Sequence, residues 1–457
     1  MPERPTQVAR LIDAHRALDL AYSPGHHGRW SASRRAGLVD ACLRELFEES
    51  GPPEGVVLVA LGGYGRGELM PFSDIDLLLL HRGDRGEEVA AVAKTIFYVL
   101  WDAGFSVGHA VRTPQECAAV AADRLDSATA MLDGRTLAGS EDTWHEALAL
   151  VLELVRGDPQ AFAERLREDA SERHRRYGSV SHLLEPDVKE GAGGLRDVHS
   201  LGWLAAGVGG GSGLAALEAA GLLRASELQA VEAAHEFLVR VRSALHLETG
   251  RATDRLFLDL QEQIAGSLGF ADEPGLRAVD GLMRSVFEHA RQVKHVAGSA
   301  FDRFLLGGSQ PREVDPSPQG VLRAFADLAH ERGVMSPATL DLIEEVELPD
   351  PVEWTEGVRE TFLEILRAGE EGVRALETMD RMGVLERFLP EWGPVRCRPQ
   401  RDPYHRYTVD VHLLRSLARM ARLLTDGDRG DPLASEAAEL AQDRDPLLLG
   451  ALLHDIG

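Results

Sequence analysis

The sequence is poor in the residues that disulfides, membrane spans and nucleic-acid binding require. Only three cysteines occur among the 457 residues, Cys42, Cys117 and Cys397, and they form no C-x-x-C pair. Such isolated cysteines favour free thiols in a reducing compartment over a disulfide or zinc site. The longest apolar runs, such as LLLGALL, are far shorter than the roughly 20 residues of a membrane span, and the N-terminus lacks a signal-peptide core. We therefore expect a cytoplasmic protein without a membrane partner.

Basic residues are also scarce relative to acidic ones. Lysine and arginine number 49 against 74 aspartates and glutamates, which gives a net charge of −25. A strongly acidic surface repels the phosphates of DNA and RNA, so we expect no nucleic-acid partner. The composition, 44% hydrophobic and 27% charged, is otherwise that of a globular protein. Its length is too great for one ordinary core and suggests about three domains.

The apolar patterns divide the chain into one region with strands and several helical regions. The segments VVLVAL, DIDLLLL and FSVGHAVRT are typical of strands, and VAAVAKTIFYVLWDAG between them is typical of a helix that ends at Gly104. The fold class that we predict is therefore α+β and mostly helical. The predicted units are an N-terminal helical segment (1–54), an α/β domain (55–145), a helical domain (146–306), a helical connecting domain (320–395) and a last helical domain (402–457).

The segment LGGYGRGELMPFSDIDLLLL, residues 61–80, carries the strongest chemical signal. Side chains alternate along a strand, so Asp74 and Asp76 should project from one face while Ile75 and Leu77 enter the core. Two neighbouring carboxylates repel each other unless a cation lies between them. Magnesium commonly bridges such a pair to substrate phosphates, and two-metal sites catalyse displacement at phosphorus. We therefore predict that Asp74 and Asp76 are catalytic metal ligands.

The residues before the acid pair fit a phosphate-binding turn. Gly62 and Gly63 remove side chains where the backbone would approach a triphosphate. Arg66 and Ser73 could add a charge and a hydrogen bond to the phosphates. The alternative is a structural turn followed by a strand with two solvent-facing acids. The glycine pair, the spacing and the apolar residues around both acids favour the nucleotide site.

This pattern resembles the signature of the DNA polymerase beta-like nucleotidyltransferases. In that superfamily a third carboxylate usually completes the site on a later strand, and Asp133, Asp102 and Asp126 compete for that position here. The resemblance to the superfamily alone leaves the acceptor of the nucleotide open.

Longer segments narrow the resemblance to one family. The 61–80 string, VGHAVRT (107–113), LLEPDVKEGAGGLRDVHSLGW (183–203) and FLVRVRSALHLETGRATDRLFLDLQEQIAGSLGF (237–270) resemble the bifunctional PII uridylyltransferase/uridylyl-removing enzymes of nitrogen signalling. The resemblance implies transfer of a uridylyl group from UTP to a tyrosine hydroxyl of a PII-type protein, with Mg²⁺ (or Mn²⁺) and release of pyrophosphate. In the second segment Lys189 and Arg196 could reach phosphate, or pair with Glu185, Glu190 or Asp197.

The last region resembles an HD phosphohydrolase domain. DPYHRYTVDVHLLRSLARMARLL and LLLGALLHDIG place His412, His454 and Asp455 at positions that match metal ligands of that family. The alternative is a histidine on a helix surface and an ordinary helix end. The sequence stops at Gly457, directly after this signature, so we expect either a fragment of a longer protein or a hydrolase without its remaining ligands. We accordingly predict that this chain transfers nucleotides but does not remove them.

Two rival functions stay open at this stage. One is adenylyl transfer from ATP to PII or to glutamine synthetase, because the motif addresses phosphates and metal rather than the base. The other is a regulatory module that holds nucleotide without turnover, which the intact pair Asp74 and Asp76 disfavours.

Overall fold

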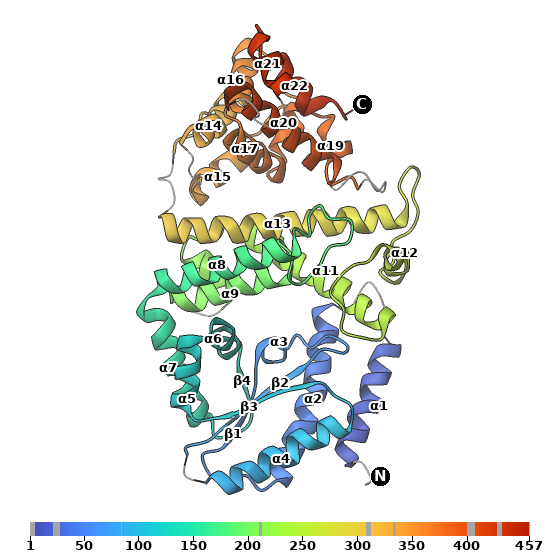
Figure 1. Ribbon diagram of the computed structural model, residues 1–457, viewed down its shortest axis with the longest axis vertical. Coiled ribbons are helices and arrows are strands. Elements are labelled where there is room, and N and C mark those ends of the chain that lie inside the picture. Colours follow the sequence, from blue (N-terminus) through green and yellow to red (C-terminus); the bar gives the residue numbers. More distant parts are fainter. Residues whose placement is uncertain are drawn as a thin grey trace.

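The computed structural model describes residues 5–21, 28–83, 85–209, 213–307, 312–331, 335–399, 407–426 and 432–456. It is mostly helical with one small mixed sheet, which confirms the α+β class. Three layers stack along the long axis (Figure 1): a layer that contains the sheet, a middle layer of helices and an upper layer of helices. None of the described helices could span a bilayer. Residues 402–406 and Gly457 of the last predicted domain lie outside the described residues.

The sheet has the strand order β3-β2-β1-β4. Strand β1 is antiparallel to both of its neighbours, whereas β2 and β3 are parallel. The bounds are Val57–Ala60 for β1, Ile75–Leu80 for β2, Val107–Arg112 for β3 and Arg135–Gly139 for β4. The three strands expected from the sequence are confirmed, and the short helix α3 (Gly62–Gly65) follows β1 directly.

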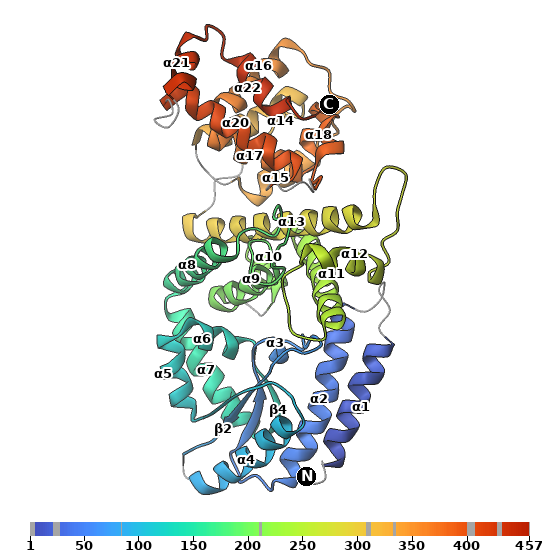
Figure 2. The same cartoon turned by 45° about the vertical axis from the view of Figure 1, so that its right-hand side comes forward.

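Helices cover both faces of the sheet. One face packs against α1 (Thr6–Leu20), α2 (Arg29–Glu49) and α4 (Gly86–Asp102), and the other against α5 (Pro114–Asp123), α6 (Leu125–Leu132) and α7 (Glu141–Gly157). Figure 2 shows α1 and α2 side by side along the sheet. Because Val8 of α1 and Leu43 of α2 share a core with β1 and β2, the segment predicted at 1–54 packs as part of the sheet layer.

The long helix α13 (Ala278–Leu306) runs across the middle layer (Figure 1). Its apolar face buries Val286, Phe287 and Val293 among the other helices of this layer. Those helices are α8 (Pro159–Tyr177), α9 (Leu195–Val208), α10 (Leu214–Ala219), α11 (Ala225–Thr249) and α12 (Leu258–Ser267).

The upper layer has a single hydrophobic core that extends from Val321 to Leu452. The regions predicted at 320–395 and 402–457 therefore pack together, although their boundaries stay predictions. Ser336 directly precedes Pro337, which is typical of a helix start, and it caps α15 by accepting a hydrogen bond from the Thr339 N–H. The helices are α14 (Pro318–Glu331), α15 (Pro337–Glu344), α16 (Glu356–Arg367), α17 (Glu370–Arg381), α18 (Val384–Phe388), α19 (Trp392–Val395), α20 (Val409–Asp426), α21 (Pro432–Leu440) and α22 (Asp445–Leu453).

A buried ion cluster joins the middle and upper layers. Arg291 of α13 donates to Asp380 of α17 at 2.8 Å and to Asp410 of α20 at 2.5 Å. Asp380 is 3% exposed and Asp410 is fully buried. Burial alone would raise the pKa of the Asp410 carboxyl, but Arg291 and the backbone N–H of Cys397 hold that pKa below its ordinary value.

We predict that Arg291→Met costs roughly 3–5 kcal/mol of unfolding free energy at pH 7, because the buried Asp410 loses its counter-ion. Asp380 keeps an ion pair with Arg396 at 3.0 Å. In the native protein the stability due to the low pKa of Asp410 is lost as the pH falls through that value. In the variant, burial instead raises the pKa of the Asp410 carboxyl, so the deficit should shrink between pH 7 and pH 5. Urea unfolding at both pH values measures this.

The matched control is Arg359→Met, which removes an exposed arginine of α16 and should change stability by less than about 0.5 kcal/mol. A deficit of Arg291→Met that grows on acidification would contradict the ion-cluster assignment.

Candidate active site

Asp74 and Asp76 lie where β2 begins and face a pocket of about 270 Å³ between the sheet layer and the middle layer. Ile75 and Leu77 are each 1% exposed, so the alternation expected from the sequence is confirmed. The pocket is lined by residues from both layers, which are Gly62, Gly63, Tyr64, Arg66, Glu68, Leu69, Ser73, Asp74, Asp76, Asp126, Thr129, Ala130, Asp133, Lys189, Arg196, His199, Trp203, Arg242, Ala252 and Asp254.

The electrostatics of Asp76 fit a cation site. Burial raises the pKa of the Asp76 carboxyl, the negative charge of Asp74 raises it further, and Lys189 lowers it. The two carboxylates thus repel each other in the protein alone. A hard divalent cation such as Mg²⁺ would reverse this repulsion, and carboxylate oxygens are the ligands that it prefers. The residues present therefore fit a magnesium ion held by Asp74 and Asp76.

The glycines of the turn have different roles. Gly62 adopts a φ of +54°, which favours glycine, and a Cβ on Gly65 would lie 2.3 Å from the carbonyl oxygen of Asp133. A Cβ on Gly63 would meet no atom closer than 3.6 Å. Backbone conformation and packing therefore require Gly62 and Gly65, while Gly63 lines the pocket without either constraint. Sequence reasoning assigned Gly62 and Gly63 to phosphate and missed Gly65.

Arg66 and Ser73 both line the pocket, but of the two only Ser73 has a buried polar atom without a hydrogen-bond partner among the described residues. Arg66 donates to Glu68 at 3.0 Å and to Asp133, so two acids already hold its guanidinium. Among the described residues, the buried Oγ of Ser73 has no hydrogen-bond partner. A buried hydroxyl without a partner is unfavourable, and a ligand oxygen in this pocket would satisfy it.

Two of the three candidates for a third carboxylate line the pocket, so which of them completes the site stays a prediction. Neither β3 (VGHAVR) nor β4 (RTLAG) contains an acidic residue. The residue of β3 beside Asp76 is Gly108, where a Cβ would come within 2.1 Å of the Asp76 Oδ1. Asp133 lies just before β4 and accepts hydrogen bonds from Arg66 and Trp203. Of the other candidates, Asp126 lines the pocket and Asp102 does not.

A buried network around Glu68 connects the two layers beside this pocket. The Glu68 carboxylate is 2.9 Å from Nε2 of His199 on α9 and 2.7 Å from Nε2 of His235 on α11. Burial would raise the pKa of Glu68, but His199, His235 and Arg66 hold it well below its usual value. Burial lowers the pKa of His199, so its neutral ring donates to the carboxylate. Sequence reasoning missed these residues, although Glu68 and His199 lie within the quoted family segments.

Basic side chains form the wall of the pocket that comes from the middle layer. Lys189 lies 3.5 Å from Glu190 and 3.7 Å from Asp254, and Arg196 lies 3.9 Å from Glu190. Arg242, which sequence reasoning did not single out, donates to Asp254 at 2.6 Å. The expected pairing of Lys189 and Arg196 with Glu190 is thus confirmed. Both residues also line the pocket of Asp74 and Asp76, and their contact with phosphate stays a prediction.

The structure brings His412, His454 and Asp455 together in the upper layer. The two Nε2 atoms of the histidines are 3.1 Å apart, and each lies 3.7 Å from an oxygen of Asp455. Nδ1 of His454 lies 3.0 Å from the carbonyl oxygen of Ala451 and can donate to it, which would leave Nε2 available for a metal. Within the described ranges, this is one of two groups of three possible ligands, and Glu68, His199 and His235 form the other.

Comparisons with known proteins agree with this geometry. Residues 41–130 match the family model described as a nucleotidyltransferase domain, and residues 160–301 match the model described as GlnD PII-uridylyltransferase. Bifunctional uridylyltransferase/uridylyl-removing enzymes from Streptomyces coelicolor and Phenylobacterium zucineum are 35% and 33% identical over 92% of this chain. The one from Vibrio vulnificus is 32% identical over 99%. The alignments cover 52%, 49% and 54% of these relatives, so the chain spans about half their length.

We predict that Asp76→Asn stabilises the metal-free protein, because it removes a partly buried charge that Asp74 repels. Mg²⁺ should raise the melting temperature of the native protein and have little effect on the variant, since binding to the folded state alone stabilises it. Thermal unfolding with EDTA or Mg²⁺ measures both effects. The control Asp102→Asn lies outside the pocket and should keep the Mg²⁺ response. An unchanged Mg²⁺ response in Asp76→Asn would refute the ligand assignment.

Proposed function

Since this chain belongs to the family of bifunctional uridylyltransferase/uridylyl-removing enzymes, we propose that it transfers a uridylyl group from UTP to a PII-type signalling protein. The observation that carries the proposal is the pocket in which the acid pair Asp74 and Asp76 faces Lys189, Arg196 and Arg242. The match to a nucleotidyltransferase domain includes the acid pair and supports the same reaction class. Three buried free cysteines are consistent with a cytoplasmic location, which is part of the proposal.

The acidic and the basic residues of the pocket have separate roles in this reaction. Asp74 and Asp76 would hold Mg²⁺ or Mn²⁺, which would neutralise the charge on the phosphate oxygens. Lys189 and Arg242 are positioned to bind the triphosphate, because both line the pocket that the acid pair enters. Gly63 leaves room for the phosphates, and the Ser73 hydroxyl can donate to one of them. The acceptor oxygen then bonds to the α-phosphorus as the bond to pyrophosphate breaks.

The names of the relatives favour uridylyl over adenylyl transfer. The pocket residues named above would bind phosphates and metal, so they do not distinguish UTP from ATP. The silent binding module is disfavoured because a pocket that only held nucleotide would not need the unfavourable pair of Asp74 and Asp76. We therefore keep adenylyl transfer to PII or glutamine synthetase as the alternative to test.

The proposal predicts that label from α-labelled UTP appears on a PII protein in the presence of Mg²⁺, and that ATP gives far less. Asp76→Asn should reduce the rate by about 10³-fold or more, because the metal site acts in the transition state. Combining it with Asp74→Asn should add little, since the pair acts as one site. Labelling of PII by ATP but not by UTP would show that ATP is the nucleotide donor. Near-normal transfer by Asp76→Asn would refute the assignment of the metal site.

A second candidate function rests on His412, His454 and Asp455. These three residues would hold a divalent ion, and such an ion could activate water for hydrolysis of the uridylyl–PII bond. The relatives are named as uridylyl-removing enzymes, whereas the sequence alone predicted no removal by this chain. Incubation of this chain with uridylylated PII and Mn²⁺ decides between removal and no removal of the uridylyl group. UMP release that His454→Ala abolishes would establish the second function, and absence of release would confirm the sequence prediction.

A further inference from the structure

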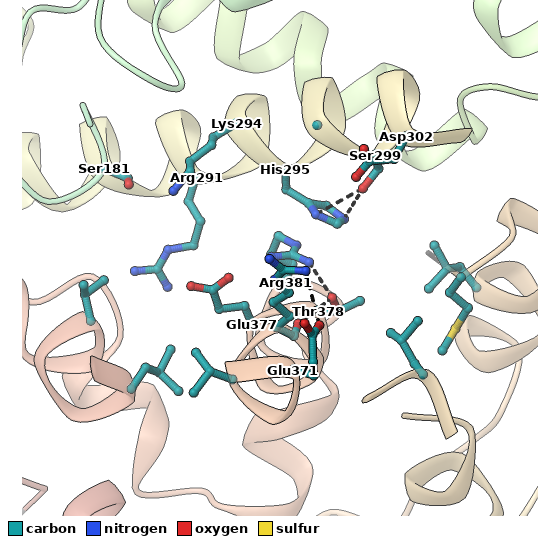
Figure 3. A pocket seen from close by; sticks show the side chains of 18 of the residues that line it. Ser181, Arg291, Lys294, His295, Ser299, Asp302, Glu371, Glu377, Thr378 and Arg381 are labelled. Atoms are coloured by element: carbon teal, nitrogen blue, oxygen red, sulfur yellow. Dashed lines mark hydrogen bonds and ion pairs between the residues drawn. The ribbon is translucent and has the colours of Figure 1, made fainter. Parts of the chain in front are cut away.

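A second pocket, of about 530 Å³, lies between α13 and the upper layer. Figure 3 shows Arg291, Lys294 and His295 on one wall, and Arg381 and Glu377 on the wall opposite. It shares no lining residue with the pocket of Asp74 and Asp76, and none of His412, His454 and Asp455 lines it. It is therefore separate from both sites described above.

The lining of this pocket is basic, in contrast to the acidic chain as a whole. Six cationic side chains line it, against three acidic ones. The cations are Arg291, Lys294, Arg303, Arg374, Arg381 and Arg415, and the acids are Asp302, Glu371 and Glu377. A cavity with this excess of positive charge, in a protein with a net charge of −25, attracts anions.

Half of these cations already have carboxylate partners. Arg291 pairs with Asp380 and Asp410, Arg303 pairs with Glu227 at 2.7 Å, and Arg374 pairs with Glu371 at 3.2 Å. For Lys294, Arg381 and Arg415, no carboxylate of the described residues lies within ion-pair distance, although Arg415 binds the Tyr407 hydroxyl. These three side chains therefore have charge left for a ligand.

Arg381 is the strongest indication of a missing anion. Its guanidinium donates to the Thr378 hydroxyl at 2.6 Å, and its buried Nε has no hydrogen-bond partner among the described residues. Burial lowers the pKa of Arg381 to about 10, only partly offset by Glu377 and Asp380. A desolvated charge without a partner is costly, and an anion in the pocket would remove that cost.

The remaining lining limits the kind of anion. His295 is neutral, because burial and the neighbouring Arg381 and Arg303 lower its pKa well below the usual value. Its ring and the Ser299 hydroxyl, 3.3 Å apart, can bind phosphate oxygens or polar ligand groups. The lining also contains an apolar set that could contact a ring or chain, which consists of Leu306, Leu328, Met335 and Leu340.

We propose that this pocket binds a small phosphate-bearing molecule, whose phosphate oxygens contact Arg381 and Lys294. Guanidinium groups bind phosphate through paired hydrogen bonds, and the ammonium of Lys294 adds a second charge. Because Lys294 belongs to α13 and Arg381 to α17, the bound molecule contacts both layers and stabilises their junction. This site does not depend on the transferase proposal, since the two pockets have no residue in common.

The test is calorimetric titration of the whole chain with inorganic phosphate, UMP and uridine in EDTA, so that neither candidate metal site holds an ion. We expect binding of phosphate and UMP but not of uridine. If UMP binds more tightly than phosphate, the ligand is a nucleotide. If the two bind with equal affinity, the pocket recognises the phosphate group alone. Arg381→Met and Lys294→Met should each lower the affinity about tenfold or more. The exposed control Arg359→Met should leave it unchanged.

Thermal unfolding separates this role from a structural one. Without ligand, Arg381→Met should melt at a higher temperature than the native protein, because it removes a desolvated charge whose Nε has no hydrogen-bond partner. Lys294 is exposed, so Lys294→Met keeps the test valid even if Arg381→Met does not fold. Absence of phosphate binding, or binding that both variants retain, would overturn the proposal.

Discussion

The candidate active site depends on the contact between the buried carboxylate of Glu68 and the side chains around it. Glu68 belongs to the segment between α3 and β2, and it binds Arg66 from its own layer and His199 and His235 from the middle layer. A carboxylate with 8% exposure persists only where such donors surround it. The network thus fixes α9 and α11 relative to β2, and with them the two walls of the pocket. Loss of Glu68 would leave His199 and His235 without this carboxylate, whereas Arg66 would keep Asp133.

Both pockets keep charges that the protein alone does not neutralise. In the first, Asp76 has a raised pKa beside Asp74, and in the second, Arg381 has a lowered pKa and an Nε without a partner. By contrast, the charges at the junction balance, because Arg291 and Arg396 together pair with Asp380 and Asp410. Charges that raise the free energy of the folded protein concentrate at binding sites. At such a site a ligand of opposite charge neutralises the unfavourable charge, and this makes its binding more favourable.

Helix α13 lies between these pockets and contacts the surroundings of both. On one side, the loop that carries Lys189 contacts α13. The close approach is at Gly193, where a Cβ would come within 2.1 Å of the Ala290 carbonyl oxygen. On the other side, Arg291 and Lys294 line the second pocket. A change in the packing of this helix would therefore reach the basic wall of the first pocket through direct contact. Glycine at position 193 makes that close contact possible.

The sequence by itself determined the local features, because side-chain alternation and capping act within one element. The strand of Asp74 and Asp76, the burial of Ile75 and Leu77, and the Ser336 cap all followed from residues a few positions apart. Family resemblance added the reaction class. Only tertiary packing decided that Arg66 is held by acids and that Lys189, Arg242 and His199 share one pocket. Distances between elements depend on how whole layers pack, and no short sequence pattern encodes them.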